Sequence, residues 1–399
     1  MQGGITLLTG DASYIKKMNR ALILSKIIEL HLISRADLAK ITGLNKATVS
    51  VQVSDLLSEE LIIETQQEHK NLGRRPIMLS INPQAGFVLG IDLDKKSITF
   101  NLSTMNGAPF QTNTIELQSS DYDIILDLLI KHIEDYKHQC AHTRYGLAGV
   151  VIGIHGIVNN DEMIYFVPQH RWRNKNLKED LMNEIGINVS IENNANLCSL
   201  AEKVYKHHQC GNLLSISLYS GIGLGIMVNG ESLKGCHGYA GEIGHMIIVP
   251  DGKPCSCGNL GCWEQYASET SFYKQLSENN HEPDFRNGDI KHLLLKQEPN
   301  IGHLMDQYIK YLSIGLNNII NLYNPEILVV NSELLLMVPN AVTKIKKHLT
   351  STISHYCELL VSELGNSACI MGACALAIKN FLEVSELSLT YNEKKTSLS

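Results

Sequence analysis

Apolar positions recur at helical spacing close to the start of the chain. Between residues 15 and 33 they follow the helical period and predict a first helix. Ser34, with Asp37 three residues later, forms a variant of the capping box and predicts a second helix that runs through Ile41. Gly43 then predicts a turn.

A third helix is expected to start near Asn45 and to end at about Leu57. Two short apolar runs, at residues 61–64 and 77–81, predict strands joined by a polar loop. Three helices followed by a pair of strands is the order of a winged helix-turn-helix domain. We therefore predict such a domain over residues 15–82.

The pattern changes after Pro83 to strands that alternate with helices. This alternation predicts an α/β domain in two lobes over residues 83–388. Both ends of the chain, residues 1–14 and 389–399, are polar without apolar periodicity and are predicted to be flexible tails. Strands are expected at 87–92, 97–102, 146–154, 189–191, 213–218, 224–228 and 327–330, and helices at 122–137, from 195, at 302–323 and at 371–382.

Composition and charge narrow the function. No apolar run reaches the roughly 18 residues of a membrane span, and the start lacks the order of a secretory signal, so we expect a cytoplasmic protein without membrane contact. The net charge is -7, but residues 12–80 hold ten Lys and Arg against seven Asp and Glu. The positive charge therefore lies in the small N-terminal domain, as expected for a part that meets phosphate.

The predicted third helix has the residues of a DNA-reading helix. Such a helix offers short polar side chains at its N-terminal end, where they face base edges. The Gly-Arg-Arg-Pro tip before the second strand suits phosphate contact or minor-groove insertion. The alternative is a helical hairpin with a basic turn and no DNA role. We favour double-stranded operator DNA as a partner, contacted by Arg35, Asn45, Lys46, Ala47, Thr48, Ser50, Gln52, Arg74 and Arg75.

Three of the ten cysteines are closely spaced. Cys255, Cys257 and Cys262, with His245 ten residues upstream, offer three thiolates and one imidazole. This is a complete tetrahedral set for structural zinc, and a closed set cannot activate a water molecule. Glycines between the cysteines allow the tight turn that such a site needs. The alternative is four reduced residues that lie close by chance, and the scattered cysteines indicate packing.

Two carboxylates flank this predicted zinc site. Glu242 lies three residues before His245, and Glu264 lies two after the last cysteine. Carboxylates together with amides are the groups that hold the hydroxyls of a sugar. Asn193 and Asn194, after a predicted strand, are candidates for the amides, and the alternative is that they are ordinary loop or cap residues.

The stretch Glu242-Ile-Gly-His245 together with Cys255-Ser-Cys-Gly-Asn-Leu-Gly-Cys-Trp-Glu264 resembles the signature of the ROK family of repressors, open reading frames and sugar kinases. The stretch from Ser34 to Ser50 and the Gly-Arg-Arg-Pro tip are similar to the family's repressor branch. The resemblance implies a two-lobed, actin-like ATPase fold with sugar bound between the lobes. It implies sugar contacts at Asn193, Asn194, Glu242, His245 and Glu264, and zinc ligands at His245, Cys255, Cys257 and Cys262.

The chain departs from the family's kinases at the positions that perform the reaction. Kinase members have an Asp, which acts as general base, where this chain has Asn194, and an amide cannot take a proton in that way. Asp92-Leu-Asp-Lys-Lys96 replaces the usual Asp-x-Gly-Gly-Thr phosphate loop, and Ile222 replaces a hydroxyl donor in the second loop. No catalytic residue is therefore predicted.

The resemblance implies a repressor of sugar-utilisation genes that a monosaccharide releases from its operator. Xylose is the expected effector, with glucose or another monosaccharide left open. We expect a homodimer that places two recognition helices in successive major grooves, with further pairing to a tetramer left open. The competing hypothesis is an ATP-dependent sugar kinase that carries a DNA-binding head.

Overall fold

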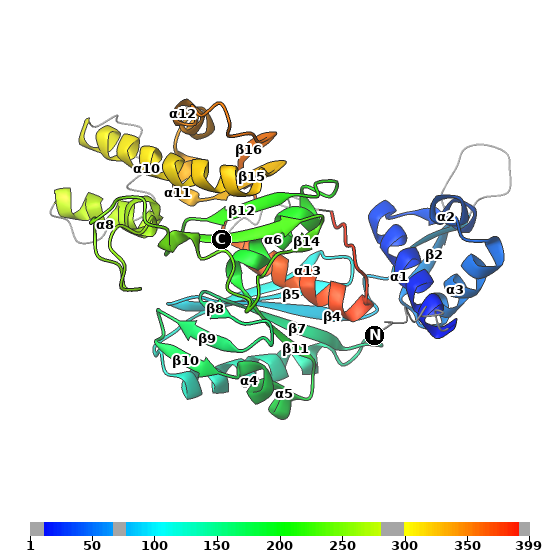
Figure 1. Ribbon diagram of the computed structural model, residues 1–399. Coiled ribbons are helices and arrows are strands. Elements are labelled where there is room, and N and C mark those ends of the chain that lie inside the picture. The colour runs from blue at the N-terminus through cyan, green and yellow to red at the C-terminus, as the bar shows by residue number, and fades with distance from the viewer. Residues whose placement is uncertain (1–11, 67–76, 281–298, 391–399) are drawn as a thin grey trace, which may run out of the picture.

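The computed structural model describes residues 12–66, 77–280 and 299–390. Figure 1 shows a small N-terminal domain, here called the head, beside two larger lobes that each contain a sheet. No helix among the described residues is long and apolar enough to cross a bilayer. The predicted α/β class with an N-terminal helix-turn-helix is confirmed.

The head has the predicted order of three helices and a strand pair. Ser34 caps the second helix by accepting a hydrogen bond from the Asp37 amide at 3.1 Å, and Asn45 caps the third through the Thr48 amide at 2.8 Å. Gly43 makes the turn between them with a φ of 70°. The elements are α1 (Ala12–Leu30), β1 (Ile33–Ser34), α2 (Arg35–Thr42), α3 (Lys46–Ser58), β2 (Ile62–Gln66) and β3 (Ile77–Ile81), with the strands in the order β1-β3-β2.

The first lobe is a five-stranded sheet in the order β11-β7-β4-β5-β6. Strands β4, β7 and β11 are parallel, whereas β5 and β6 are antiparallel to their neighbours. The lobe comprises β4 (Phe87–Leu93), β5 (Ser97–Thr104), β6 (Pro109–Glu116), α4 (Tyr122–Cys140), β7 (Leu147–Ile154), α5 (Leu177–Ile185) and β11 (Val189–Asn193). A small sheet of β8 (Ile157–Val158), β9 (Ile164–Val167) and β10 (Trp172–Lys175) extends it.

The second lobe repeats this plan with the strand order β14-β13-β12-β15-β16. Again three strands, β12, β15 and β16, are parallel, and β13 is antiparallel to β12. Its strands are β12 (Leu213–Ser217), β13 (Gly223–Val228), β14 (Glu231–Ser232), β15 (Ile327–Asn331) and β16 (Glu358–Val361). Its helices are α7 (Glu264–Ala267), α8 (Glu269–Asn280), α10 (Pro299–Tyr323), α11 (Glu333–Met337) and α12 (Ala341–His348).

Two helices lie between the sheets. Figure 1 shows α6 (Asn194–Tyr205) and α13 (Ala368–Leu382) in this central layer, with α4 and α5 beyond one sheet and α10 and α12 beyond the other. Close packing of α6 requires glycine in β13: a Cβ atom at Gly225 would lie 2.2 Å from the Ala195 carbonyl oxygen. The central helices share one hydrophobic core with the head, so the lobes and the head are continuously packed.

The last described residues run between the head and α6. Glu383 forms an ion pair with Lys17 at 2.8 Å, and the Glu386 carbonyl accepts a hydrogen bond from Ser25. Leu389 is 2% exposed, so the prediction of a flexible tail from residue 389 is wrong at that position. At the other end, α1 already begins at Ala12, within the predicted N-terminal tail.

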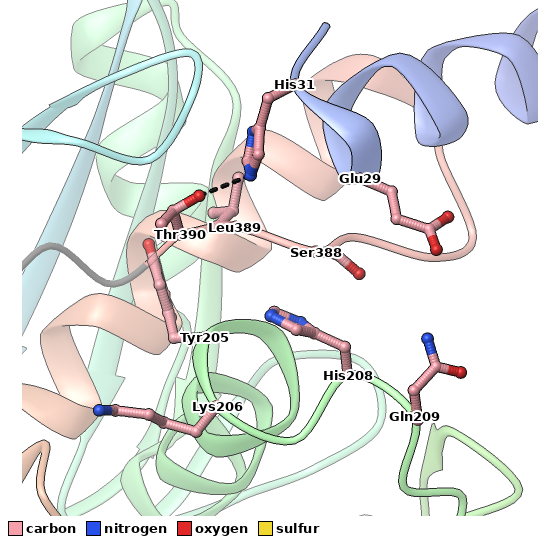
Figure 2. Close-up of a pocket in the computed structure, with 9 residues that line it drawn as sticks. All are labelled: Glu29, His31, Tyr205, Lys206, His208, Gln209, Ser388, Leu389 and Thr390. Atoms are coloured by element: carbon pink, nitrogen blue, oxygen red, sulfur yellow. Dashed lines mark hydrogen bonds between the residues drawn. The ribbon is translucent and has the colours of Figure 1, made fainter. Parts of the chain in front are cut away.

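A cavity of about 400 Å³ lies at this junction, lined by polar and apolar groups (Figure 2). It is lined by the end of α1, the end of α6 and the C-terminal segment 388–390. Thr390 Oγ1 and His31 Nε2 are 2.6 Å apart, and they join the C-terminal segment to the head directly. The head is therefore fixed against the rest of the protein by several contacts of the C-terminal segment, and not only by its covalent connection.

Candidate functional site

The predicted zinc ligands come together in the structure. The donor atoms of His245, Cys255, Cys257 and Cys262 all lie within 4.8 Å of one another. Cys255 Sγ is 3.6 Å from His245 Nδ1, and Cys257 Sγ is 3.6 Å from Cys262 Sγ. Bonds of about 2.3 Å to sulfur and about 2.0 Å to nitrogen around a tetrahedral ion place the ligands about 3.5 to 3.8 Å apart. The donor set and its spacing therefore fit zinc.

A tight loop presents the cysteines. The Cys255 amide donates to the Asn259 carbonyl at 2.9 Å, and the Gly258 amide donates back to the Cys255 carbonyl at 3.0 Å. Gly258 and Gly261 have φ values of 98° and 84°, which favour glycine. A Cβ atom at Gly261 would also lie 1.7 Å from the Val249 carbonyl oxygen. The glycines that the sequence places between the cysteines are thus required by the backbone.

Trp263 fixes this loop to the second lobe. Its ring is fully buried, and its Nε1 donates a hydrogen bond to the Tyr311 carbonyl of α10 at 2.9 Å. A Cβ atom at Gly315, one helical turn further, would lie 2.0 Å from a ring atom of Trp263. The indole therefore packs directly on the α10 backbone, and the residues on both sides of it have a fixed position.

Glu242, His245 and Glu264 lie together beside the zinc cluster. Glu264 Oε1 is 3.7 Å from His245 Nδ1 and accepts a hydrogen bond from Cys255 Sγ at 3.1 Å. Glu242 is accessible to solvent, yet the protein around it desolvates its carboxylate and, with Glu264, raises its pKa. Because Nδ1 of His245 faces the sulfur atoms, its Nε2 is left for another hydrogen-bond partner.

Burial raises the pKa of the Cys255 thiol to about 12. Without a metal, this thiol stays protonated and donates to Glu264. A bound zinc ion would hold the sulfur atoms as thiolates and fix the loop, so that Cys255 would no longer donate a hydrogen bond to Glu264.

The two asparagines have different roles at the start of α6. Asn193 is its N-cap: Oδ1 accepts from the Ala195 amide at 2.8 Å, and Nδ2 donates to the Gly156 carbonyl at 2.8 Å. The Asn194 side chain is half-buried and makes no hydrogen bond to any residue that the structure describes. Of the two predicted amides, Asn193 therefore caps the helix, and Asn194 keeps its side-chain amide available for another partner.

The segment 221–223 connects the asparagines with the carboxylates. A Cβ atom at Gly221 would lie 3.1 Å from Glu264 Oε2, and one at Gly223 would lie 3.0 Å from the Ala195 Cβ. The predicted sugar residues on α6 and on the zinc loop therefore meet on two sides of one short segment.

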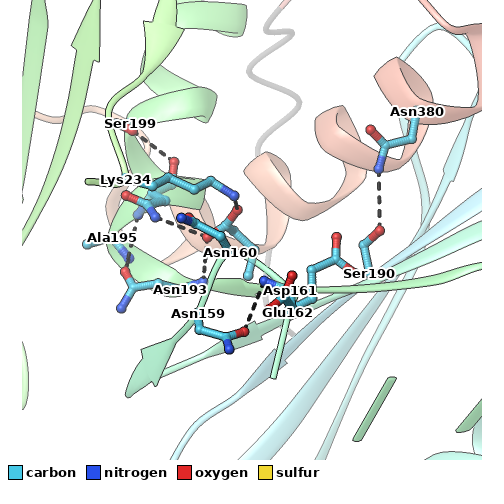
Figure 3. Close-up of polar contacts among 12 residues, drawn as sticks. Asn159, Asn160, Asp161, Glu162, Ser190, Asn193, Ala195, Ser199, Lys234 and Asn380 are labelled. Carbon is cyan, nitrogen blue, oxygen red and sulfur yellow. Dashed lines mark hydrogen bonds and ion pairs between the residues drawn. The ribbon is translucent and has the colours of Figure 1, made fainter. Parts of the chain in front are cut away.

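Two contacts between the lobes were not predicted from the sequence. Lys234, after β14, forms an ion pair with Glu192 at the end of β11, and Figure 3 shows it beside Asn193. Asn160, in the loop before β9, donates from Nδ2 to the Cys236 carbonyl at 2.9 Å. No sequence motif marks either residue. Each contact depends on how the two folded lobes are placed, which a motif does not encode.

The start of α3 is exposed, as a DNA-reading helix requires. Lys46, Ala47 and Ser50 are exposed, and Thr48 is half-buried. Asn45 is also exposed, but its side chain is used as the cap of the helix.

Gln52 does not belong to this exposed face. It is 3% exposed and lies among the core residues of the head, so its prediction as a DNA contact is wrong. Arg35 forms an ion pair with Glu64 of β2 at 2.7 Å and remains partly exposed. The predicted contacts Arg74 and Arg75 lie outside the described residues.

The geometry of the four metal-ligand residues agrees with a family assignment. The ROK family model matches residues 88–380. The chain belongs to the ROK family. Its His245, Cys255, Cys257 and Cys262 cluster is typical of the zinc-binding motif of that family.

Similar ROK proteins fall into two groups. The chain is 34% identical to the xylose repressor of Bacillus subtilis, over 94% of this chain and 98% of the relative. A solved ROK family transcriptional regulator, a homologue of the E. coli MLC protein, matches with a TM-score of 0.77 and 26% identity over 92% of this chain and 96% of its own. A ROK glucokinase from Streptomyces griseus matches with a TM-score of 0.64 at 22% identity over 73% of this chain and 99% of its own. The chain thus has the domain organisation of the family's regulators, which include the N-terminal head.

The two loops that hold phosphate in the family's kinases, at residues 92–96 and around Ile222, differ here in the structure as well as in the sequence. Ile222 is buried in the core of the second lobe, where its side chain can donate nothing to a phosphate. In the first loop, Asp92 is kept, but Asp94, Lys95 and Lys96 stand where the kinases have Gly-Gly-Thr, and the Asp94 amide is used in a hydrogen bond to the Ser97 carbonyl at 3.0 Å. Gly223 and Gly225 lie in β13 against α6, which gives them a packing role.

Proposed function

We propose that this ROK protein is a transcriptional repressor that a monosaccharide releases from operator DNA, with xylose as the first candidate effector. One observation carries the proposal. The groups suited to sugar hydroxyls, Glu242, His245 and Glu264, gather beside the zinc cluster, while residue 194 is an amide and Ile222 is buried. The site is thus equipped to hold a sugar and not to phosphorylate it. The similarity to the B. subtilis xylose repressor supports the choice of xylose.

In the proposed complex, the carboxylates of Glu242 and Glu264 accept hydrogen bonds from sugar hydroxyls, and His245 Nε2 takes part from the same side. The bound zinc supplies rigidity, since its four protein ligands leave no open position. Asn194 meets a hydroxyl from α6 without removing its proton, because an amide has no basic lone pair at neutral pH. Asn193 keeps the start of α6 in place through its cap.

In the proposed DNA complex, two heads of a homodimer place their α3 helices in successive major grooves of a pseudo-palindromic operator. Lys46 and Ser50 are the side chains best exposed for this role. The basic loop with Arg74 and Arg75 would add phosphate or minor-groove contacts. Such a role belongs in the cytoplasm, where the operator is.

The path from sugar to DNA would run through the central layer. Sugar bound between the asparagines and the zinc loop draws the lobes together near the Lys234–Glu192 pair. Helix α13 packs on the first-lobe sheet and on α6, and its end joins the head through Glu383 and Lys17. If the sugar favours one lobe arrangement by about 3 kcal/mol, operator affinity falls roughly a hundredfold.

A gel-shift titration on the full-length, zinc-loaded protein tests this proposal. Xylose is expected to release operator DNA at concentrations at which glucose does not, and Glu264→Gln is expected to bind DNA but to resist release. DNA binding that no monosaccharide alters would reject the sugar-response mechanism. Release by glucose alone would keep the mechanism and replace the effector.

A coupled assay of ADP release with a panel of monosaccharides tests the competing class. We expect no turnover above background. Efficient phosphorylation of a sugar would replace the repressor proposal with that of a sugar kinase that carries a DNA-binding head.

A further inference from the structure

A second group of potential metal ligands lies away from the zinc loop. One donor atom each from Asp92, His155 and Cys369 falls within 4.8 Å of the others. Asp92 Oδ1 is 2.8 Å from His155 Nε2 and 3.4 Å from Cys369 Sγ. These residues come from the end of β4, the residue after β7 and the first turn of α13.

The backbone is arranged to bring these side chains together. Asp92 and Gly153 are neighbours across the parallel β4–β7 pair, so the carboxylate and the residues after β7 share one sheet edge. A Cβ atom at Gly153 would lie 2.6 Å from Cys369 Sγ, so only glycine lets the thiol approach this edge. Cys369 lies in the first turn of the 15-residue helix α13, which fixes the position of its sulfur atom.

The group is nearly enclosed but can be reached from solvent. Cys369 is buried, whereas the side chains of His155 and Asp92 are 14% and 18% exposed. An ion could therefore enter from the side of the imidazole and the carboxylate, with the sulfur at the bottom.

We infer that Asp92, His155 and Cys369 form a second metal site, for a thiophilic divalent transition metal such as Zn²⁺. A carboxylate, an imidazole and a thiolate together are a typical zinc donor set, whereas Mg²⁺ and Ca²⁺ prefer oxygen ligands. The 3.4 Å separation of sulfur and oxygen already suits a tetrahedral ion. The imidazole and the carboxylate must move apart by about half an ångström to admit it.

Three protein ligands leave a fourth position for water or an exchangeable ligand. This site therefore differs in kind from the closed cluster of His245 and the three cysteines. It also ties the start of α13 to the first-lobe sheet, and α13 reaches the head at its other end. The inference is independent of the proposed function, because it concerns metal binding alone.

Metal content of the full-length protein tests the inference. After loading with Zn²⁺ and desalting, mass spectrometry of the metal is expected to give two ions per chain for the unchanged protein. Cys369→Ser and His155→Gln are each expected to lose one ion. Cys374→Ser changes a second buried cysteine of α13 that lies outside the group, and it is expected to retain both ions.

Cobalt gives a second readout. Replacement of zinc by Co²⁺ is expected to give thiolate-to-metal absorption from both sites, of which Cys369→Ser removes about a quarter, since the closed cluster keeps its three thiolates. If Cys369→Ser does not fold by circular dichroism, Asp92→Asn replaces it. One ion per chain in the unchanged protein, or two ions in every one of these variants, would overturn the inference.

Discussion

The zinc loop, here called the zinc end, and the two loops that hold phosphate in the family's kinases, here called the phosphate end, differ in which residues they have kept. At the zinc end, every predicted ligand meets its partners, and the glycines and Trp263 hold them in place. At the phosphate end, Ile222 is buried in the core, and Asp94, Lys95 and Lys96 replace Gly-Gly-Thr. Under the proposed function, sugar recognition and phosphoryl transfer are therefore separable within one fold, because they depend on different loops.

The difference has a simple chemical basis. Holding a sugar needs oriented hydrogen-bonding groups, which a metal-braced loop supplies. Phosphoryl transfer also needs a base for the attacking hydroxyl and hydrogen-bond donors for the transferred phosphate. Under the proposed function, Asn194 stands where the family's kinases have the carboxylate base, and an amide has nearly the same shape as a carboxylate.

Removal of one zinc ligand is expected to have the largest effect on the response to xylose. In Cys257→Ser the closed site loses one thiolate, and the loop that positions His245 loses its brace. We expect bound zinc to fall by one ion per chain and the xylose-dependent rise in Tm to disappear, as measured by mass spectrometry and thermal shift. Cys236→Ser, which changes another exposed cysteine, is the control. An unchanged response to xylose in Cys257→Ser would contradict the proposed role of the loop.

Glu264→Gln is expected to have the next largest effect. It keeps the shape of the side chain but removes the charge that accepts a sugar hydroxyl. Hydrogen bonds to charged groups contribute about 1.5 to 3 kcal/mol, so xylose affinity should fall roughly tenfold to a hundredfold. Isothermal titration calorimetry measures it. Lys234→Ala, which breaks the ion pair with Glu192 but leaves the carboxylates in place, should reduce affinity less. The reverse order would shift the sugar contacts to the lobe junction.

Changes in α3 are expected to separate DNA binding from sugar binding. Lys46→Ala should weaken operator binding to a similar degree across sequences and reduce the slope of affinity against salt by about one. Its xylose affinity should equal that of the unchanged protein. Gln52→Ala should leave the preference for operator over unrelated duplex unchanged, because that side chain lies in the core of the head. Fluorescence anisotropy with operator and with unrelated duplex at several salt concentrations measures both, and a loss of operator preference in Gln52→Ala would restore it as a DNA contact.

Asn194→Asp is expected to have the smallest effect on activity. It returns the carboxylate of a general base, but the buried Ile222 and the replacement of Gly-Gly-Thr by Asp94, Lys95 and Lys96 still leave both phosphate loops incomplete. We therefore expect ADP release to stay at background with xylose or glucose. Measurable turnover in this variant would mean that the phosphate end is more complete than its residues suggest.

The features that depend on local sequence were predictable. The caps at Ser34 and Asn45 act within three residues, and the cysteine spacing specifies its own loop. The error at Gln52 could have been avoided by helix phase, because it lies three residues after Val49 and four before Leu56, both in the core of the head.

Other features had no local signal. Strand β6 was missed because its residues are almost all exposed, and an exposed edge strand lacks the alternation that marks a half-buried one. The pair of Lys234 and Glu192 and the hydrogen bond of Asn160 join residues far apart in the chain. Their formation depends on how two folded lobes meet, which no short window of sequence contains.

The C-terminal segment has a consequence for biosynthesis. Residues of the head, translated first, complete their packing with Val384, Leu387 and Leu389, which are translated last. A nascent chain can therefore fold its head early, but it cannot fix the orientation of that head until residues 384–389 have left the ribosome. Chains cut short by premature termination would carry a folded head without the contacts that hold it against the lobes.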